Sequence, residues 1–309
     1  MLTFNNKVIT RNDKWVAHTI DPYNPYGLPP GVIRVRTNNG REPAKWYDGE
    51  TGIYITTYET ATLVEGTNDI YDVYKSGTDF TGILNHSENV VEVIAANTQG
   101  ITNMSHMFHH CIDLTSVILF DTSSVTDMSY MFYGCNNLTI IPLYDTSNVT
   151  NMNQMFYACG NLTIVPLFDT SNVTDMTGMF NSCISLTTVP LYDTSNVTNM
   201  FHTFKYCLSL TTVPLFDTSN VTNMNQMFYG CNNLTIIPLF DTSKVTNISY
   251  AFYNCRKVES GALALYNQAS SQAVPPTSYS HTFYQCGDQT TTGAAELAQI
   301  PFSWIGWTA

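Results

Sequence analysis

Charged side chains are scarce in this chain of 309 residues, at 12% of the sequence against about 25% in a typical globular domain. Basic residues are the rarest: 12 lysines and arginines stand against 24 acidic residues, so the formal net charge is −12. A nucleic-acid-binding protein needs a basic patch to neutralise phosphates, and the composition therefore argues against that class. The polar surface must instead be neutral, because the chain holds 42 threonines and 29 asparagines.

Long apolar segments are also absent. No apolar run approaches the roughly 20 residues that span a bilayer, so we expect no membrane insertion. The first residues, MLTFNNKVITRNDKW, contain no basic segment followed by an apolar one. We therefore expect the chain to be made and folded in a cytoplasm. The 44% share of hydrophobic residues argues against a chain that is disordered throughout.

The sequence lacks the motifs of the common enzyme classes. It has no nucleophile elbow, no P-loop, no Gly-x-Gly-x-x-Gly and no zinc-ribbon pattern. His106, His109 and His110 fall close together, and we interpret them as surface histidines, with a metal site as the alternative. We therefore expect no enzymatic activity, no catalytic residue, no cofactor and no metal. A glycan-cleaving enzyme stays open as a minor alternative.

What the chain does have is a strict repeat of 24 residues. Seven units run without insertion from about residue 97 to 264, and an eighth, out of step, ends at Cys286. The unit reads D-T-S-N-V-T-x-M-x-x-M-F-x-x-C-x-x-L-T-x-[IV]-P-L-[FY]. A fixed period predicts one structural unit per repeat, stacked so that neighbours share a core. Cysteines mark the register at Cys111, Cys135, Cys159, Cys183, Cys207, Cys231 and Cys255.

Within a unit, the spacing predicts a strand followed by a short helical segment. In an L-x-x-L-x-L strand, Leu138, Ile141 and Leu143 would point inward, and the strand would end at the recurring proline. In residues 149–159, apolar side chains three and four positions apart predict a helical or 3₁₀ turn with one buried stripe. The cysteines are small and apolar enough to pack inside, so we expect them to be reduced and buried.

The aspartate that opens each unit is predicted to form a turn, because an aspartate side chain can accept the backbone N–H two residues later. A line of Ca²⁺ sites is the alternative. One carboxylate per unit is few for a cation that takes six to eight oxygens. The aspartates are Asp121, Asp145, Asp169, Asp193, Asp217 and Asp241.

The segment V-T-x-M-x-x-M-F-x-x-C-x-x-L-T-x-[IV]-P-L resembles the BspA-like leucine-rich repeats over roughly residues 97–286. That family implies an α/β solenoid, a right-handed leucine-rich-repeat array used for binding, with no known chemistry. The layout also resembles phage-encoded members, which pair a short N-terminal region with the array. The resemblance therefore implies a bacteriophage virion component, of tail or head-fibre type, that contacts a host surface protein or glycan. A bacterial surface adhesin exported by a non-Sec route and a purely structural virion decoration are the alternatives.

The array spans residues 97–255, and the sequence on either side of it departs from the 24-residue repeat. Residues 1–30, rich in proline and tyrosine at 21–30, are predicted to be an arm that orders against other virion proteins. Residues 31–96 are predicted to form a small β-rich module and N-terminal cap. Its strands are expected at 32–36, 52–56 and 69–74, with a turn at Asn39-Gly40 between the first two and residues 86–96 leading into the first unit.

Residues 256–309 are predicted to be a helical cap that contains the eighth unit. Helices are expected at 261–272 and 292–300, with Thr292 as an N-cap, and Trp304 and Trp307 would cover the last unit.

Candidate binding residues come from two sets of positions. One position is aromatic in six units, and its rings would either face a glycan or protein or pack beneath the turn. Other positions vary over a constant frame, which marks solvent-facing sites, and their Tyr, Asn, Ser and His residues suit adaptable recognition. The first set is Phe120, Tyr144, Phe168, Tyr192, Phe216 and Phe240, and the second includes Tyr130, Tyr133, Tyr157 and His202. Formation of a homo-oligomer stays open.

Overall fold

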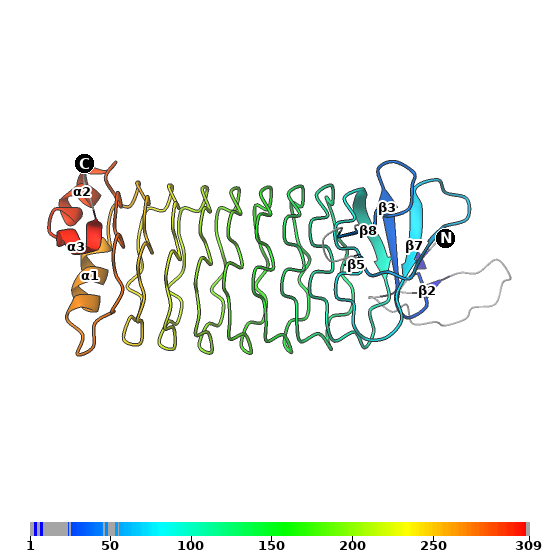
Figure 1. The fold of residues 1–309 in the computed structure, drawn as a ribbon, viewed down its shortest axis with the longest axis horizontal. Coiled ribbons are helices and arrows are strands. Elements are labelled where there is room, and N and C mark those ends of the chain that lie inside the picture. The colour runs from blue at the N-terminus through cyan, green and yellow to red at the C-terminus, as the bar shows by residue number, and fades with distance from the viewer. Residues whose placement is uncertain are drawn as a thin grey trace.

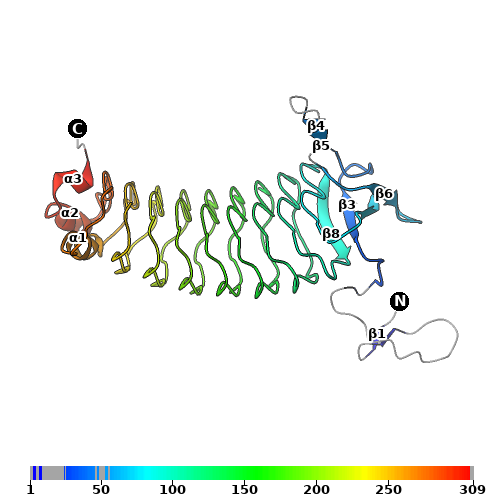
Figure 2. The ribbon, with the colours of Figure 1, turned by 60° about the horizontal axis from the view of Figure 1, so that its bottom comes forward.

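The computed structural model describes residues 24, 26–45 and 56–306, together with the backbone of four two-residue strands. Turns of the chain, which we call rungs, stack along one axis between a β-sheet at the N-terminal end and three helices at the C-terminal end (Figures 1 and 2). Most of the predicted arm at 1–30 lies outside the described residues. The short strands are β1 (Thr3–Phe4), β2 (Lys7–Val8), β4 (Tyr47–Asp48) and β5 (Ile53–Tyr54).

The rungs are held in register by parallel bridges between equivalent residues. One chain of bridges starts at Asp79, advances by 24 residues from Asn103 to Asn247, and ends at Ser278 after a step of 31. The stack therefore begins near residue 78, one rung before the predicted start at 97. Sequence reasoning missed this first rung because it carries Phe80 and Ser87 where the other units carry methionine and cysteine.

The predicted helical segment in each unit is wrong. No helix is assigned between residues 56 and 261, all of which the structure describes. In this segment, every second backbone amide donates to the next rung instead of to its own. Phe156 N donates to Met179 O of the next rung at 2.9 Å, whereas Met155 N donates within its own rung to Met152 O at 3.2 Å. Hydrogen bonding between rungs thus replaces the continuous i→i−4 pattern that a helix needs.

The extended part of each unit buries every third residue. Leu138, Ile141 and Tyr144 are buried, whereas Leu143 is 59% exposed, so the prediction that Leu143 points inward is wrong. A period of three is that of polyproline II rather than of a pleated strand. Tyr144 N donates to Pro142 O at 3.1 Å, a three-residue turn that places Leu143 at its outer corner.

The core is a set of aligned rows, one residue per rung. Phenylalanine rings from Phe108 to Phe283 stack at centroid distances of 5.2–5.8 Å. All eight cysteines are free and buried, which confirms the prediction. Their thiols also make hydrogen bonds: Cys183 Sγ donates to Phe156 O at 3.0 Å.

The Asp-Thr-Ser-Asn run is explained by three kinds of hydrogen bond. Asp145 Oδ1 accepts from Ser147 N at 3.1 Å, which confirms the predicted aspartate turn. The buried Thr146 hydroxyl donates to Asp169 O of the next rung at 2.8 Å. Asn148 Nδ2 donates to Ser123 O of the preceding rung at 2.8 Å. Neutral side chains thus tie each rung to both neighbours, which accounts for the excess of threonine and asparagine.

An antiparallel sheet covers the N-terminal end of the stack. Its order is β6 (Thr60–Leu63), β7 (Ile70–Tyr74), β3 (Val32–Thr37) and β8 (Val90–Ala96). The turn at Asn39-Gly40 does not join the two predicted strands in a hairpin, because β3 pairs with β7 and β8 and β5 pairs with β4.

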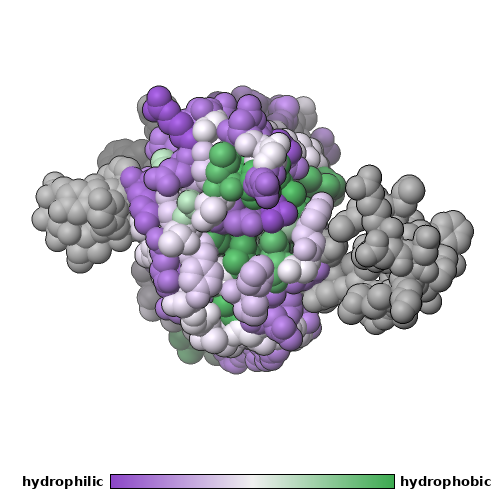
Figure 3. Space-filling view, turned by 90° about the vertical axis from the view of Figure 1, so that its right-hand side faces the viewer, coloured by the Kyte–Doolittle hydropathy of each residue, from purple (hydrophilic) through white to green (hydrophobic). Residues whose placement is uncertain are grey.

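Strand β8 belongs to the sheet and also to the first rung, since Glu92 bridges in parallel to Ser116. The sheet carries ion pairs, such as Arg34 Nε to Asp72 Oδ1 at 2.6 Å. Figure 3 looks onto this end and shows hydrophilic side chains around an apolar patch.

The C-terminal end is covered by α1 (Ala262–Ser270), α2 (Thr291–Leu297) and α3 (Phe302–Ile305). Helix α1 is inserted before the last rung and accounts for the step of 31 residues. The N-cap of α2 is Thr290, whose hydroxyl accepts from Gly293 N, and not Thr292 as predicted. Trp304 stacks on Tyr279 at 4.7 Å and is buried at this end, whereas Trp307 lies outside the described residues. No helix in the described part is long and apolar enough to cross a membrane.

Candidate functional site: an aromatic face on the stacked rungs

The turn segment of each rung presents three side chains, and the equivalents in successive rungs form three rows that we call the aromatic face. In two of the rows the backbone has positive φ, for example 56° at Tyr130. The described part contains 14 non-glycine residues with positive φ, and all lie in these two rows. The left-handed conformation, which is uncommon for such residues, turns their side chains out of the stack. The first row includes His106, Tyr130 and Gln154, the second His109, Tyr133 and Tyr157, and the third His86, His110 and Gly134.

Rings on this face stack on one another from rung to rung. Tyr133 and Tyr157 have centroids 4.5 Å apart and planes within 4°, and Tyr229 and Tyr253 are 4.6 Å apart and within 6°. Tyr250 stacks on His281 in the same way, at 4.9 Å. Since neighbouring rings cover each other's faces, the surface offers ring edges and hydroxyl groups.

The stacked rings are interrupted in the middle of the aromatic face. Gly178, Asn181 and Ser182 stand where other rungs carry aromatic side chains or histidine. Beyond this gap, Lys205 Nζ donates to Gln226 Oε1 at 2.7 Å and lies 5.0 Å from the Tyr229 ring centre. The aromatic face therefore consists of two clusters, one toward each end of the stack.

The second set of predicted binding residues lies together on this face. Tyr130, Tyr133, Tyr157 and His202 are all partly exposed there, the first three in one cluster and His202 in the other.

The first set does not lie on the surface. All six residues are buried, with exposed fractions of 0–3%, so the interpretation that these rings face a partner is wrong and the alternative, that they pack inside the stack, is confirmed. The three-residue period turns the aromatic side chain inward and the preceding leucine outward. The Tyr192 hydroxyl donates to Pro166 O at 3.0 Å, so even its polar atom is used internally. The residues concerned are Phe120, Tyr144, Phe168, Tyr192, Phe216 and Phe240.

Six of the seven histidines of the chain lie on the aromatic face. They are half-buried rather than fully exposed, and burial lowers the pKa of His86 to about 4, of His109 to about 3 and of His202 to about 4. Burial also lowers the pKa of His106 and His110. These five imidazoles are therefore uncharged at neutral pH. His86 was not singled out from the sequence, because the first rung was not recognised.

A second surface row also escaped the sequence analysis. We call it the leucine ridge; it has one leucine per rung, each directly after the proline position. From Leu143 to Leu239 these side chains are 52–61% exposed, and Leu119 is 39% exposed. The ridge is uniform from rung to rung, whereas the aromatic face varies. Its members are Leu119, Leu143, Leu167, Leu191, Leu215 and Leu239.

These features define a repeat protein in which a constant stack of rungs supports a variable side-chain face. The sequence profile of a family described as "Mycoplasma protein of unknown function, DUF285" matches residues 78–186 and 157–266. The matches together span more than half of the chain, which therefore belongs to this family. The match begins at residue 78, as does the first rung. No curated protein and no solved structure matches the chain.

Proposed function

We propose that the chain is a non-enzymatic binding protein whose aromatic face contacts a partner protein. The observation that carries this proposal is the pair of ring clusters, held in stacked rows on a frame that repeats every 24 residues from Asp79 to Asn247. Tyrosine gives a large amphipathic contact area at a low cost in conformational entropy. The rings are already ordered by stacking, so binding has little further side-chain freedom to remove.

The stacking also favours a protein over a glycan as the partner. A sugar packs on the open face of an aromatic ring, but the faces of Tyr133 and Tyr157 cover each other at 4.5 Å. Ring edges and hydroxyl groups remain, and they suit the hydrogen bonds and apolar contacts of a protein surface.

We further propose that the stack is a right-handed leucine-rich-repeat solenoid of the BspA-like kind and that the chain is a bacteriophage virion component. The repeated unit and the layout, an N-terminal region followed by the array and a cap, support this proposal. Residues 1–30 would attach the chain to the particle and the aromatic face would contact the host. Purification of virions tests this role: we expect the full chain in the particle and its loss when residues 1–30 are deleted. A chain that occurs only on bacterial cells would instead be a surface adhesin.

Binding by the aromatic face is tested with the immobilised full chain and a cell-surface fraction of the host. We expect capture of a protein that the double variant Tyr133→Ser/Tyr157→Ser no longer captures. The matched control is Leu143→Ser/Leu167→Ser, on the leucine ridge, which should capture normally. Capture that survives in the tyrosine variant would contradict the proposal. So would capture abolished by periodate, which destroys glycans, rather than by protease.

A further inference from the structure

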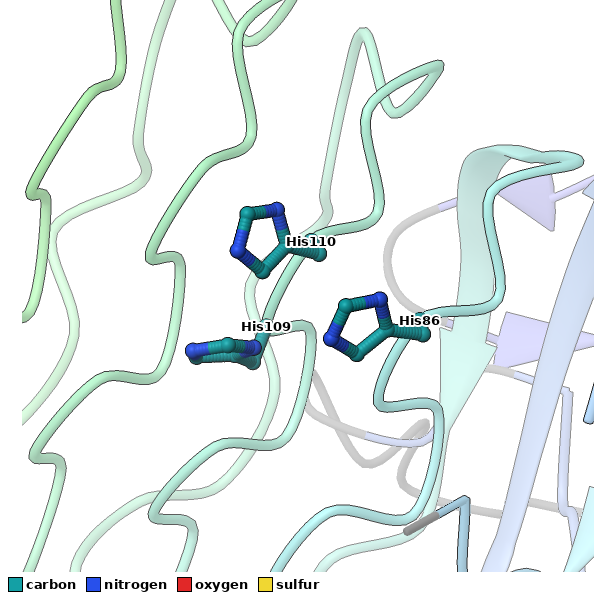
Figure 4. A group of neighbouring side chains, drawn as sticks. All are labelled: His86, His109 and His110. Carbon is teal, nitrogen blue, oxygen red and sulfur yellow. The ribbon is translucent and has the colours of Figure 1, made fainter. Parts of the chain in front are cut away.

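Three histidines from two adjacent rungs converge at the N-terminal end of the aromatic face (Figure 4). His86 and His110 occupy equivalent positions one rung apart, and their rings stack with centroids 4.6 Å apart. His109 approaches the His110 ring edge-on, also at 4.6 Å. One ring nitrogen from each of the three lies within 4.8 Å of the others.

The surroundings of His109 and His110 leave room at a ring nitrogen of each. His109 Nδ1 is buried and makes no hydrogen bond, and a buried polar atom without a partner is costly. The next rung carries Gly134 beside His110, and a Cβ at that position would lie 2.8 Å from His110 Nδ1. Glycine therefore keeps one side of this imidazole open.

We propose that His86, His109 and His110 bind one divalent transition-metal ion, with Zn²⁺ as the ion that the site suits best. Imidazole is a ligand for zinc, copper, nickel and iron, whereas magnesium and calcium prefer oxygen. In a tetrahedral zinc site with Zn–N bonds of about 2.05 Å, the ligand nitrogens lie about 3.4 Å apart. Nitrogens within 4.8 Å would reach that spacing by side-chain rotations that also turn the stacked His86 and His110 rings so that both ring planes point at the ion.

The nearby thiol is not part of the site. Cys111 is buried in the core, where its Sγ donates to Leu84 O at 3.1 Å. Three imidazoles leave the fourth tetrahedral position for water or for a side chain of a bound partner. His109 also stacks on Tyr133 at 4.7 Å, so the site is continuous with the proposed binding surface.

The ion would join the first rung to the second. His86 lies four residues before β8, the strand shared by the sheet and the first rung. A ligand that binds only the folded chain raises its melting temperature. The metal would therefore stabilise the junction between the N-terminal sheet and the stack.

The test uses the full chain, treated with chelator and titrated with ZnCl₂ at neutral pH by calorimetry. We expect one ion per chain and a higher melting temperature with zinc. His109→Ala and His110→Ala should each weaken binding by about 100-fold or more, because even partners that only orient a ligand change metal affinity by 10- to 100-fold. Replacing Zn²⁺ with Co²⁺ should give the absorption bands of a tetrahedral nitrogen-ligated ion.

His202→Ala and His281→Ala are the matched controls, since both histidines lie on the same face but outside the cluster. They should bind one ion with unchanged affinity. Circular dichroism verifies that each variant is folded, and His109→Gln offers a second replacement of similar size if His109→Ala is not. Failure of the folded wild-type chain to bind zinc stoichiometrically would overturn the proposal. Equal affinity in the folded His109 variant would do the same.

Discussion

Two sets of stacked aromatic rings run along this molecule, and they differ in how far their identity is fixed. Inside, Phe156 and Phe180 stack at 5.6 Å, and the same position is phenylalanine in every rung from Phe108 to Phe283. Outside, Tyr133 and Tyr157 stack at 4.5 Å, but the next rung carries Asn181. The geometry of stacking is shared, whereas burial is not. Burial therefore fixes the residue type, and the exposed rows are free to vary.

The largest effect is expected from the buried set. Phe180→Ala removes a ring that is 1% exposed and stacks on both neighbours, so unfolding free energy should fall by about 3–5 kcal/mol. Urea unfolding followed by circular dichroism measures the change. A loss below about 1 kcal/mol would mean that the phenylalanine row does not carry the core.

The buried threonines should come next. Thr194→Val deletes a hydroxyl that donates to Asp217 O at 2.7 Å and leaves that carbonyl without this donor, at an expected cost of about 1–3 kcal/mol. The matched control is Thr150→Val, because the Thr150 hydroxyl donates to Thr126 O at 3.3 Å from an exposed position. The control should be close to neutral in the same unfolding assay. Equal effects of the two variants would show that burial does not distinguish these bonds.

A smaller effect is expected from the exposed rings. Tyr157→Ser removes one stacked pair at the surface, and its stability cost should be about 1 kcal/mol or less. The same substitution should weaken binding to the partner. Thermal unfolding and binding measured on one preparation separate the two effects. A destabilisation as large as that of Phe180→Ala would contradict the claim that the buried rings, and not the exposed rings, stabilise the fold.

The smallest effect concerns pH. Burial, with Lys205 nearby, lowers the pKa of His202 from 6.5 to about 4, so the unfolded chain binds this proton at a higher pH than the folded chain. Stability is therefore retained above pH 6.5 and declines as the pH falls toward 4. The melting temperature should fall less between pH 7 and 5 in His202→Gln than in the wild type. Identical pH slopes would contradict the half-buried placement of this imidazole.

Sequence reasoning succeeded where one residue type recurs for a local reason. The period of 24, the buried cysteines and the turn at Asp145 follow from spacing and side-chain chemistry within one unit. It failed where backbone geometry decides the direction of a side chain. The predicted L-x-x-L-x-L pattern and the observed three-residue period both bury Leu138 and Ile141, but they exchange the places of Leu143 and Tyr144.

The remaining differences come from contacts distant in sequence. Strand β3 pairs with β7 and β8, and no local pattern near Asn39-Gly40 specifies those partners. The first rung lacks the methionines and the cysteine that mark its successors, so only its stacking on the second rung identifies it. The cluster of His86, His109 and His110 was missed for the same reason, because His86 belongs to the first rung.

Hydroxyl-radical footprinting of the native chain, read residue by residue by mass spectrometry, tests the contrast between the two ring sets most directly. Tyr133 and Tyr157 should be oxidised rapidly in the folded chain, whereas Tyr144 and Tyr192 should be protected until the chain is unfolded in denaturant. Equal oxidation of the two pairs in the native chain would contradict the account.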